Sequence, residues 1–187
     1  MFDSQQALAF ANTRLDRPGG LVDALADRDA AAAWLTRDLG YSPDRPLEEA
    51  EHAGLLRVRD SVRRLIRARG AGEAPPPGDL ETVNQASAAA PWAEQLGAAW
   101  QRSARFTATG SAAPGNLTEL LGALASAAIA LTADPPADLA ECAADDCVVL
   151  FLRTDPRKRW HSDRCGNRMR AARSYARRRS ESPGPAN

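Results

Sequence analysis

Cysteine and histidine are scarce in this chain of 187 residues, which has three cysteines and two histidines in all. No cysteine occurs in the first 141 residues. The sequence also lacks a glycine-rich phosphate loop, an HExxH pair and a GxSxG elbow. His52 lies alone in an acidic segment, where we expect a solvated side chain rather than a general base. We therefore predict no enzymatic activity, and these absences argue against a small-molecule-converting enzyme.

Long apolar runs and a secretory signal are missing as well. The longest nearly uncharged run, residues 120–133, is too short to span a bilayer. The amino terminus, MFDSQQALAF, has no basic region and carries Asp3. Together with unpaired thiols, these features predict a cytoplasmic protein with no membrane partner. Aromatic residues make up only 5%, and the many alanines and leucines favour helices.

The formal net charge of zero conceals an asymmetry. Residues 153–179 hold eleven Lys or Arg against two acids, a net charge of +9, whereas residues 1–152 carry −8. A basic tail on an acidic body favours a polyanionic partner for the tail.

Hydrophobic periodicity predicts a mainly α body (α+β with a small β-hairpin) over residues 1–137. Alternation in residues 98–109 predicts a strand, one arm of that hairpin. Leu55, Val58 and Val62 begin a buried stripe on the middle helix, and the apolar helix ending at Leu131 is expected at the centre of the core. The predicted helices span residues 4–14, from Asp27 or Asp29 to Leu39, 46–68, 79–90, and from Asn116 or Thr118 to Leu131.

Side chains at the ends and on the surfaces of these helices carry further expectations. Ser4 and Asp79 are predicted to cap the first and fourth helices. The arginines of the middle helix are expected on its solvated faces; they are Arg57, Arg63, Arg64 and Arg67.

Four candidate metal ligands follow the body in the pattern C-x4-C-x13-H-x3-C, as Cys142, Cys147, His161 and Cys165. Two short-spaced pairs separated by enough chain for a hairpin are typical of a tetrahedral Zn²⁺ site. With all four positions filled by protein, such a site is structural rather than catalytic. We predict one structural zinc ion. The alternatives are three unrelated buried thiols or an iron–sulfur cluster, which usually takes four thiolates.

The module around these ligands, residues 138–180, is predicted to be a small treble-clef-like zinc finger, followed by a disordered tail over residues 181–187. We expect residues 148–153 to form a strand that turns at Asp155-Pro156 and returns through residues 157–161. Cys165 is expected at the start of a helix, whose free N–H groups favour a thiolate. So small a module needs the metal for most of its folding free energy.

The last helix is predicted to be amphipathic, with Met169, Ala172 and Ala176, and Tyr175 alongside, facing inward. Its other side is nearly all guanidinium, which suits phosphate and guanine contacts. We therefore predict DNA as the partner; a solvated tail or docking onto the acidic body are the alternatives. The predicted nucleic-acid-binding residues are Arg157, Lys158, Arg159, Arg168, Arg170, Arg173, Arg177 and Arg178.

The sequence CGNR at residues 165–168, preceded by RW at residues 159–160 and by C-x4-C, resembles the CGNR zinc-finger family. That family usually has cysteine where this chain has His161. The body resembles the family's partner domain, called ABATE, in FANTR at residues 10–14, WL at residues 34–35 and its middle and last helices. The resemblance implies a stress-related transcription regulator with a DNA-binding finger and an amino-terminal domain that senses a ligand or partner.

For this sensing role we predict Asn12, Arg14 and Trp34 as effector-binding residues, with a small molecule as the effector. Asn12 and Arg14 are the polar residues of the FANTR segment, and Trp34 offers an aromatic wall. A protein- or RNA-interaction module without sequence-specific DNA binding is the alternative function. Because a single small finger binds DNA weakly, we leave open a homodimer.

Overall fold

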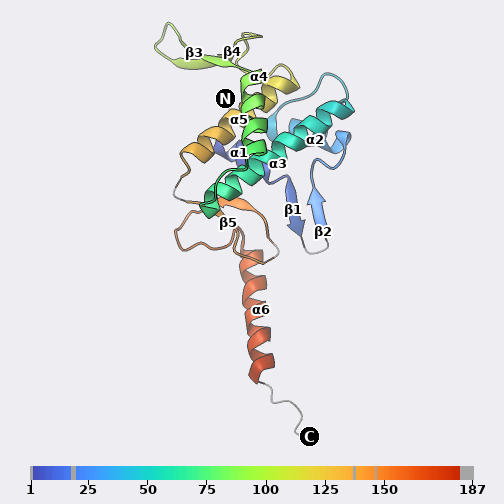
Figure 1. Ribbon diagram of the computed structural model, residues 1–187, viewed down its shortest axis with the longest axis vertical. Coiled ribbons are helices and arrows are strands. Elements are labelled where there is room, and N and C mark those ends of the chain that lie inside the picture. Colours follow the sequence, from blue (N-terminus) through green and yellow to red (C-terminus); the bar gives the residue numbers. More distant parts are fainter. Residues whose placement is uncertain (1, 18–19, 137, 146, 182–187) are drawn as a thin grey trace.

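The computed structural model describes residues 2–17, 20–136, 138–145 and 147–181. The predicted tail beyond residue 181 lies outside the described residues. Helices dominate this part of the chain, as the sequence predicts (Figure 1). The helices are α1 (Ser4–Ala11), α2 (Arg28–Leu39), α3 (Glu49–Ala71), α4 (Pro77–Ala89), α5 (Leu117–Ala133) and α6 (Asp163–Glu181).

The strands of the described residues form antiparallel hairpins, each of two strands. They are β1 (Arg14–Arg17) with β2 (Gly20–Asp23), β3 (Trp92–Leu96) with β4 (Arg102–Phe106), and β5 (Leu139–Glu141) with β6 (Leu150–Leu152). The predicted body hairpin is present as β3–β4, although its second arm is shorter than residues 98–109. The β1–β2 hairpin was not predicted, since Pro18-Gly19-Gly20 indicated only a break.

Local capping explains where the helices begin and end. The α1 helix is capped by Asp3, not Ser4: the Asp3 carboxylate accepts from the N–H groups of Gln5 and Gln6. Of the two predicted candidates for the α2 cap, Asp27 and Asp29, the structure uses Asp27, whose carboxylate accepts from Ala30 N–H at 2.8 Å. Gly40 ends α2 with a φ of 66°, in the left-handed region that glycine favours.

Apolar faces of the body helices meet in one core. Leu55 and Val62 of α3 and Leu120 and Leu124 of α5 are fully buried, which confirms the predicted stripe and the central position of α5. Helix α1 packs on α3 and α5, and α4 packs on the same pair. Figure 1 shows α3 crossing the body between α2 and the β5–β6 end.

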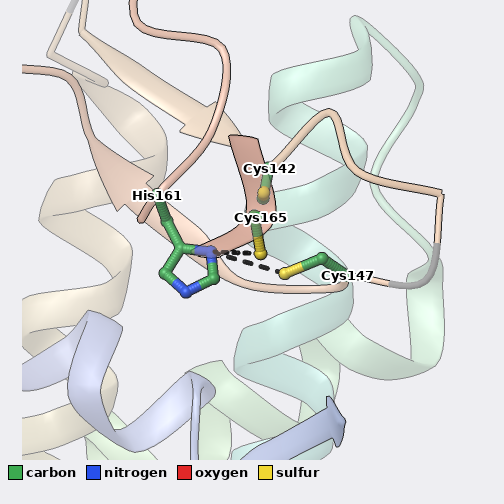
Figure 2. Close-up of side chains that lie close together, drawn as sticks. All are labelled: Cys142, Cys147, His161 and Cys165. Atoms are coloured by element: carbon green, nitrogen blue, oxygen red, sulfur yellow. Dashed lines mark hydrogen bonds between the residues drawn. The ribbon is translucent and has the colours of Figure 1, made fainter. Parts of the chain in front are cut away.

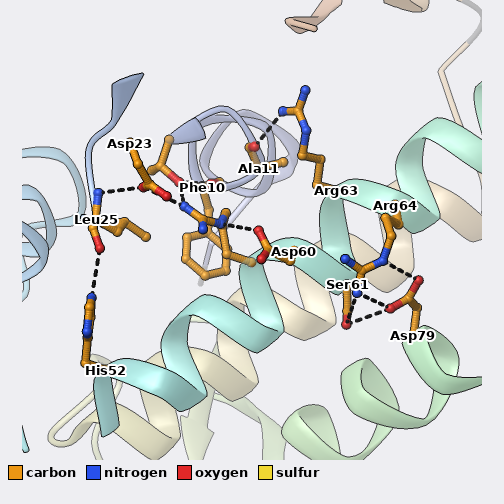
Figure 3. A network of polar contacts seen from close by, with 12 residues as sticks. Phe10, Ala11, Asp23, Leu25, His52, Asp60, Ser61, Arg63, Arg64 and Asp79 are labelled. Atoms are coloured by element: carbon orange, nitrogen blue, oxygen red, sulfur yellow. Dashed lines mark hydrogen bonds and ion pairs between the residues drawn. The ribbon is translucent and has the colours of Figure 1, made fainter. Parts of the chain in front are cut away.

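Arg57, Arg64 and Arg67 are exposed as predicted, but polar contacts inside the body bury two other arginines of α3 (Figure 3). Arg59 is 2% exposed and pairs with Asp23 at 2.7 Å and with Asp60 at 2.6 Å. Arg63, predicted to be solvated, is buried and donates to the Ala11 carbonyl at 2.9 Å. These α3 guanidiniums replace water with carboxylates and carbonyls, as buried charges require.

Two further side chains differ from their predicted roles. His52 is half-buried rather than solvated, with Nε2 2.8 Å from the Leu25 carbonyl oxygen. Asp79 does not cap α4. It is buried and accepts from Ser61 at 2.9 Å and from Arg64 at 2.6 Å, so it ties α4 to α3.

The α6 helix projects from the end of the molecule that carries β5–β6, away from the body helices (Figure 1). The β3–β4 hairpin and the amino terminus lie at the opposite end. Among the described residues, every helix is too short or too polar to cross a membrane.

Candidate metal centre

The predicted ligands come together in one cluster (Figure 2). One ligand atom from each of the four residues lies within 4.8 Å of the others. The three cysteines are buried free thiols, and His161 is half-buried. The imidazole turns Nδ1 toward the sulfurs: this atom lies 3.4 Å from Cys147 Sγ and 3.7 Å from Cys165 Sγ.

These distances fit a tetrahedral zinc ion. Zn²⁺ binds sulfur at about 2.3 Å and nitrogen at about 2.0–2.1 Å, so two ligands at a tetrahedral angle are about 3.6 Å apart for S and N. The two measured S···N distances lie on either side of this value. The cluster is compatible with one structural zinc ion, held by three thiolates and His161 Nδ1.

Electrostatics explain why this cluster needs a cation. Burial raises the pKa of the Cys147 thiol to about 12; a backbone hydrogen bond from Val149 opposes the rise, and Cys142 and Cys165 add to it. Burial, with the charges of Lys158 and Arg168, lowers the pKa of His161, which favours the neutral imidazole that binds metals. Three neighbouring thiolates are stable here only with a metal ion to compensate their charge.

The β5–β6 hairpin presents the first ligand pair. Cys142 follows β5 directly, and its N–H donates to the Val149 carbonyl at 2.9 Å, while Cys147 N–H donates to Ala144 at 2.9 Å. The loop between the strands, which begins at Cys142 and carries Cys147, is called the metal-gripping turn below. The predicted strand return through residues 157–161 is wrong: β6 pairs instead with β5, upstream of Cys142.

The second ligand pair reaches the first through a segment without regular structure. Ala143 N–H donates to the Arg159 carbonyl at 2.9 Å, which fixes the approach to His161. Cys165 lies in the first turn of α6, as predicted, and its N–H donates to Ser162 Oγ at 3.4 Å.

Gly166 allows the chain to pack tightly behind the metal ligands. A Cβ at this position would lie 3.1 Å from Trp160 Cε3, closer than most real Cβ contacts. The indole in turn lies under Arg170, whose guanidinium carbon is 5.6 Å from the ring centroid. The RW and CGNR segments therefore form one packed unit.

Apolar packing around the centre is slight. The described buried residues of this cluster are Cys142, Ala144, Cys147, Cys165 and Met169. Met169 is the inward residue that the α6 pattern predicted, but Ala172, Tyr175 and Ala176 are exposed, so the predicted inward stripe is wrong beyond Met169. Beyond Met169, residues 170–179 of α6 are exposed except the half-buried Ser174, and Figure 1 shows this helix projecting away from the β5–β6 end.

Three body residues hold the finger on both sides of its metal-gripping turn. The Asn12 amide donates to the Leu150 carbonyl at 2.7 Å and accepts from Leu150 N–H at 3.0 Å. Arg63 donates to the carbonyl of Val148, the residue after Cys147. Arg67 pairs with Glu141, the residue before Cys142, at 3.2 Å. Sequence reasoning missed this junction, since its partners are 74 to 138 positions apart.

The predicted nucleic-acid-binding residues lie in two segments, the one before His161 and helix α6. Lys158 is half-buried in the segment before His161, and Arg168 is half-buried in α6. The remaining predicted residues are exposed: Arg157, Arg159, Arg170, Arg173, Arg177 and Arg178. Arg164 and Arg179 are also exposed on α6 and add to the same charge, although the prediction did not include them.

The three predicted effector-binding residues lie in different environments. The Asn12 amide is engaged by Leu150 in both directions. Arg14 is exposed on β1, and Trp34 is buried in the core, 6.0 Å from the Phe10 ring. Asn12 thus has a structural partner, and effector contact by these residues stays a prediction.

A helical body joined to a four-ligand metal centre at the start of a basic helix defines a two-part zinc-finger protein. Comparison with family models gives the same two-part organisation. The chain belongs to the ABATE family, described as "Putative stress-induced transcription regulator", whose model matches residues 5–135. The CGNR zinc finger model matches residues 139–178. No curated protein matches the chain.

Proposed function

We propose that this protein is a zinc-dependent, DNA-binding transcription regulator without catalytic activity. The observation that carries the proposal is the exposed arginine face of α6, anchored at its first turn by Cys165. Both family models are compatible with a regulatory zinc-finger protein. Its free thiols suit the reducing cytoplasm as the place of action.

DNA is the best partner for α6 because of its shape and charge. A helix that stands clear of the body can enter a major groove without a clash from α1–α5 (Figure 1). Arg173, Arg177 and Arg178 are exposed along it, where guanidiniums bind phosphates and guanine edges. Arg157 and Arg159, in the segment before His161, supply secondary phosphate contacts in this proposal.

The metal centre sets where the helix points. With zinc bound, Cys165 and His161 fix the start of α6 relative to the hairpin, and Asn12 and Arg63 fix the hairpin relative to the body. The body is then the part that senses an effector or partner. A change in the body reaches the helix through this junction.

The test is binding of zinc-loaded protein to pooled genomic DNA fragments in the presence of nonspecific competitor. We expect enrichment of a few fragments, lost on chelation. If about five arginines neutralise phosphates, log K falls with log salt with a slope of roughly −4 to −5. Arg173→Gln should weaken binding and reduce the slope by about one. Arg37→Gln, which removes an exposed charge of α2, is the matched control.

Uniform weak binding that is insensitive to chelation would contradict the proposal. A protein partner retained at high salt and after nuclease treatment would instead favour an interaction module. The exposed Tyr175 would be the first residue to examine there.

A further inference from the structure

A cavity of about 250 Å³ lies at the end of the body opposite the metal centre. Its walls come from the amino terminus and α1, from the end of α2, from the base of the β3–β4 hairpin and from α5. In Figure 1 the amino terminus and the β3–β4 hairpin lie together at this end, and α6 leaves from the other. The cavity is thus formed by segments far apart in the sequence.

The walls are mainly aromatic and apolar. The aromatic residues among them are Phe2, Tyr41, Trp92 and Phe106. Among the described lining residues, Arg105 alone carries a formal charge. One of its N–H groups donates to the Gly110 carbonyl at 3.0 Å, and a guanidinium has five such donors. The lining therefore combines several aromatic residues with one cationic residue, Arg105 of β4.

Size limits the ligand. An apolar cavity of about 150 Å³ holds benzene, whereas drug-sized molecules occupy about 300–1,000 Å³. The volume of about 250 Å³ lies between these values and suits one ring with one or two substituents. We propose that this cavity binds a small aromatic carboxylic acid, its ring among Tyr41, Trp92 and Phe106 and its carboxylate at Arg105. This inference rests on the effector-sensing part of the proposed function.

Helix α1 connects the cavity to the finger. Gln6 in its first turn, and Phe2 just before the helix, line the cavity. Asn12, its C-cap, holds Leu150 of β6, three residues after Cys147. The helix is eight residues, or about 12 Å, long, and its buried face makes it a rigid element. A ligand that shifts the first turn of α1 therefore shifts the residue that positions the metal-gripping turn.

The experiment titrates benzoate into the zinc-loaded full chain and follows two NMR signals, the Trp92 indole N–H and the Leu150 backbone N–H. The expected result is saturable shifts of both signals with one Kd. Arg105→Gln should weaken benzoate binding about tenfold and leave binding of the neutral analogue benzyl alcohol unchanged. Arg102→Gln, on the same strand and paired with Glu94, is the matched control. Ala104→Leu, which fills the cavity, should weaken both ligands.

Absence of benzoate binding at millimolar concentrations, or equal binding by Arg105→Gln and Arg102→Gln, would overturn the site. A shift of Trp92 without a shift of Leu150 would overturn the connection through α1. Neither readout requires DNA. Failure of DNA binding in the ligand-free protein would contradict the proposed function instead, so the two failures are distinguishable.

Discussion

The body buries leucine, isoleucine and aromatic side chains from several helices in one continuous core, whereas the buried cluster of the finger consists largely of its metal ligands. Burial of apolar surface stabilises the first without any cofactor. In the second, three of the described buried residues are cysteines that also bind the ion. The two regions should therefore respond oppositely to metal removal and to mutations of the core.

This difference in how the body and the finger are stabilised also indicates where the two regions influence each other. A region held by its own core keeps its shape when α6 is bound or released. The finger is held by its metal, by three body residues and by Leu150 of β6, which is buried in the body core. The junction made by Asn12, Arg63 and Arg67 is where the two regions constrain each other.

The largest expected effect follows from removing a metal ligand. Cys165→Ala should reduce zinc from one ion per chain to near zero and leave the finger unfolded, because structural zinc contributes about 10–16 kcal/mol to such modules. The body should keep its helices. Metal analysis together with limited proteolysis measures both, and chelated wild type resupplied with zinc is the control. Unchanged zinc stoichiometry would contradict the ligand assignment.

Arg63→Met breaks the junction from the α3 side. The buried carbonyl of Ala11 and the half-buried carbonyl of Val148 lose their donor, and we expect a loss of about 2–4 kcal/mol in the free energy of unfolding. Zinc should also be released faster to a chelator, since Val148 adjoins Cys147. Arg57→Met, at an exposed position of the same helix, is the control. Equal effects of the two substitutions would show that Arg63 does not hold the finger.

Asn12→Ala tests the α1 side with a smaller effect. Loss of both hydrogen bonds to Leu150 should cost about 1–3 kcal/mol and accelerate zinc release. Asn12→Asp keeps an acceptor for Leu150 N–H but removes the donor to the Leu150 carbonyl, so its stability should fall between those of Asn12→Ala and wild type. Chemical denaturation with zinc-release kinetics measures this. The exposed Asn84→Ala should stay within about 0.5 kcal/mol of wild type.

The smallest expected effect, that of Asp79→Asn, is limited to the body. Hydrogen bonds from Arg64 lower the pKa of Asp79; burial opposes this and Ser61 adds to it. A carboxyl with a lowered pKa contributes stability above its unfolded value of 3.8, and this stability is lost as the pH falls through the lower folded value. Asp79→Asn should cost about 1 kcal/mol at pH 7, progressively less below pH 4, and leave zinc content unchanged. A change in zinc content would mean that the regions are coupled through α4.

Acid should also separate the regions. Zinc binding requires thiolates, so protons compete with the metal and zinc is released as the pH falls. The body keeps its Asp79 and Asp23 pairs until lower pH, since both carboxyls have lowered pKa values. Titration followed by metal release and by far-UV circular dichroism should show the finger transition first. Simultaneous transitions would contradict separate means of stabilisation.

Local signals in the sequence were sufficient for most helices and for the metal centre. The α2 and α5 caps, Asp27 and Asn116, bond to an N–H three residues away, so the sequence narrowed each cap to two nearby candidates and the structure decided between them. The α3 stripe follows from helical periodicity. The β1–β2 hairpin was missed because its four-residue strands carry too little alternation to be distinguished from a break.

The sequence by itself determined the metal centre, because its four ligands fall within 24 consecutive residues and their chemistry leaves few alternatives. Only the tertiary structure decided that Arg63 is buried, that β6 pairs with β5, that Ala172 and Ala176 are exposed and that the aromatic cavity exists. Each of these depends on which distant segments lie side by side. Such placement is set by packing of the whole core, which no local pattern records.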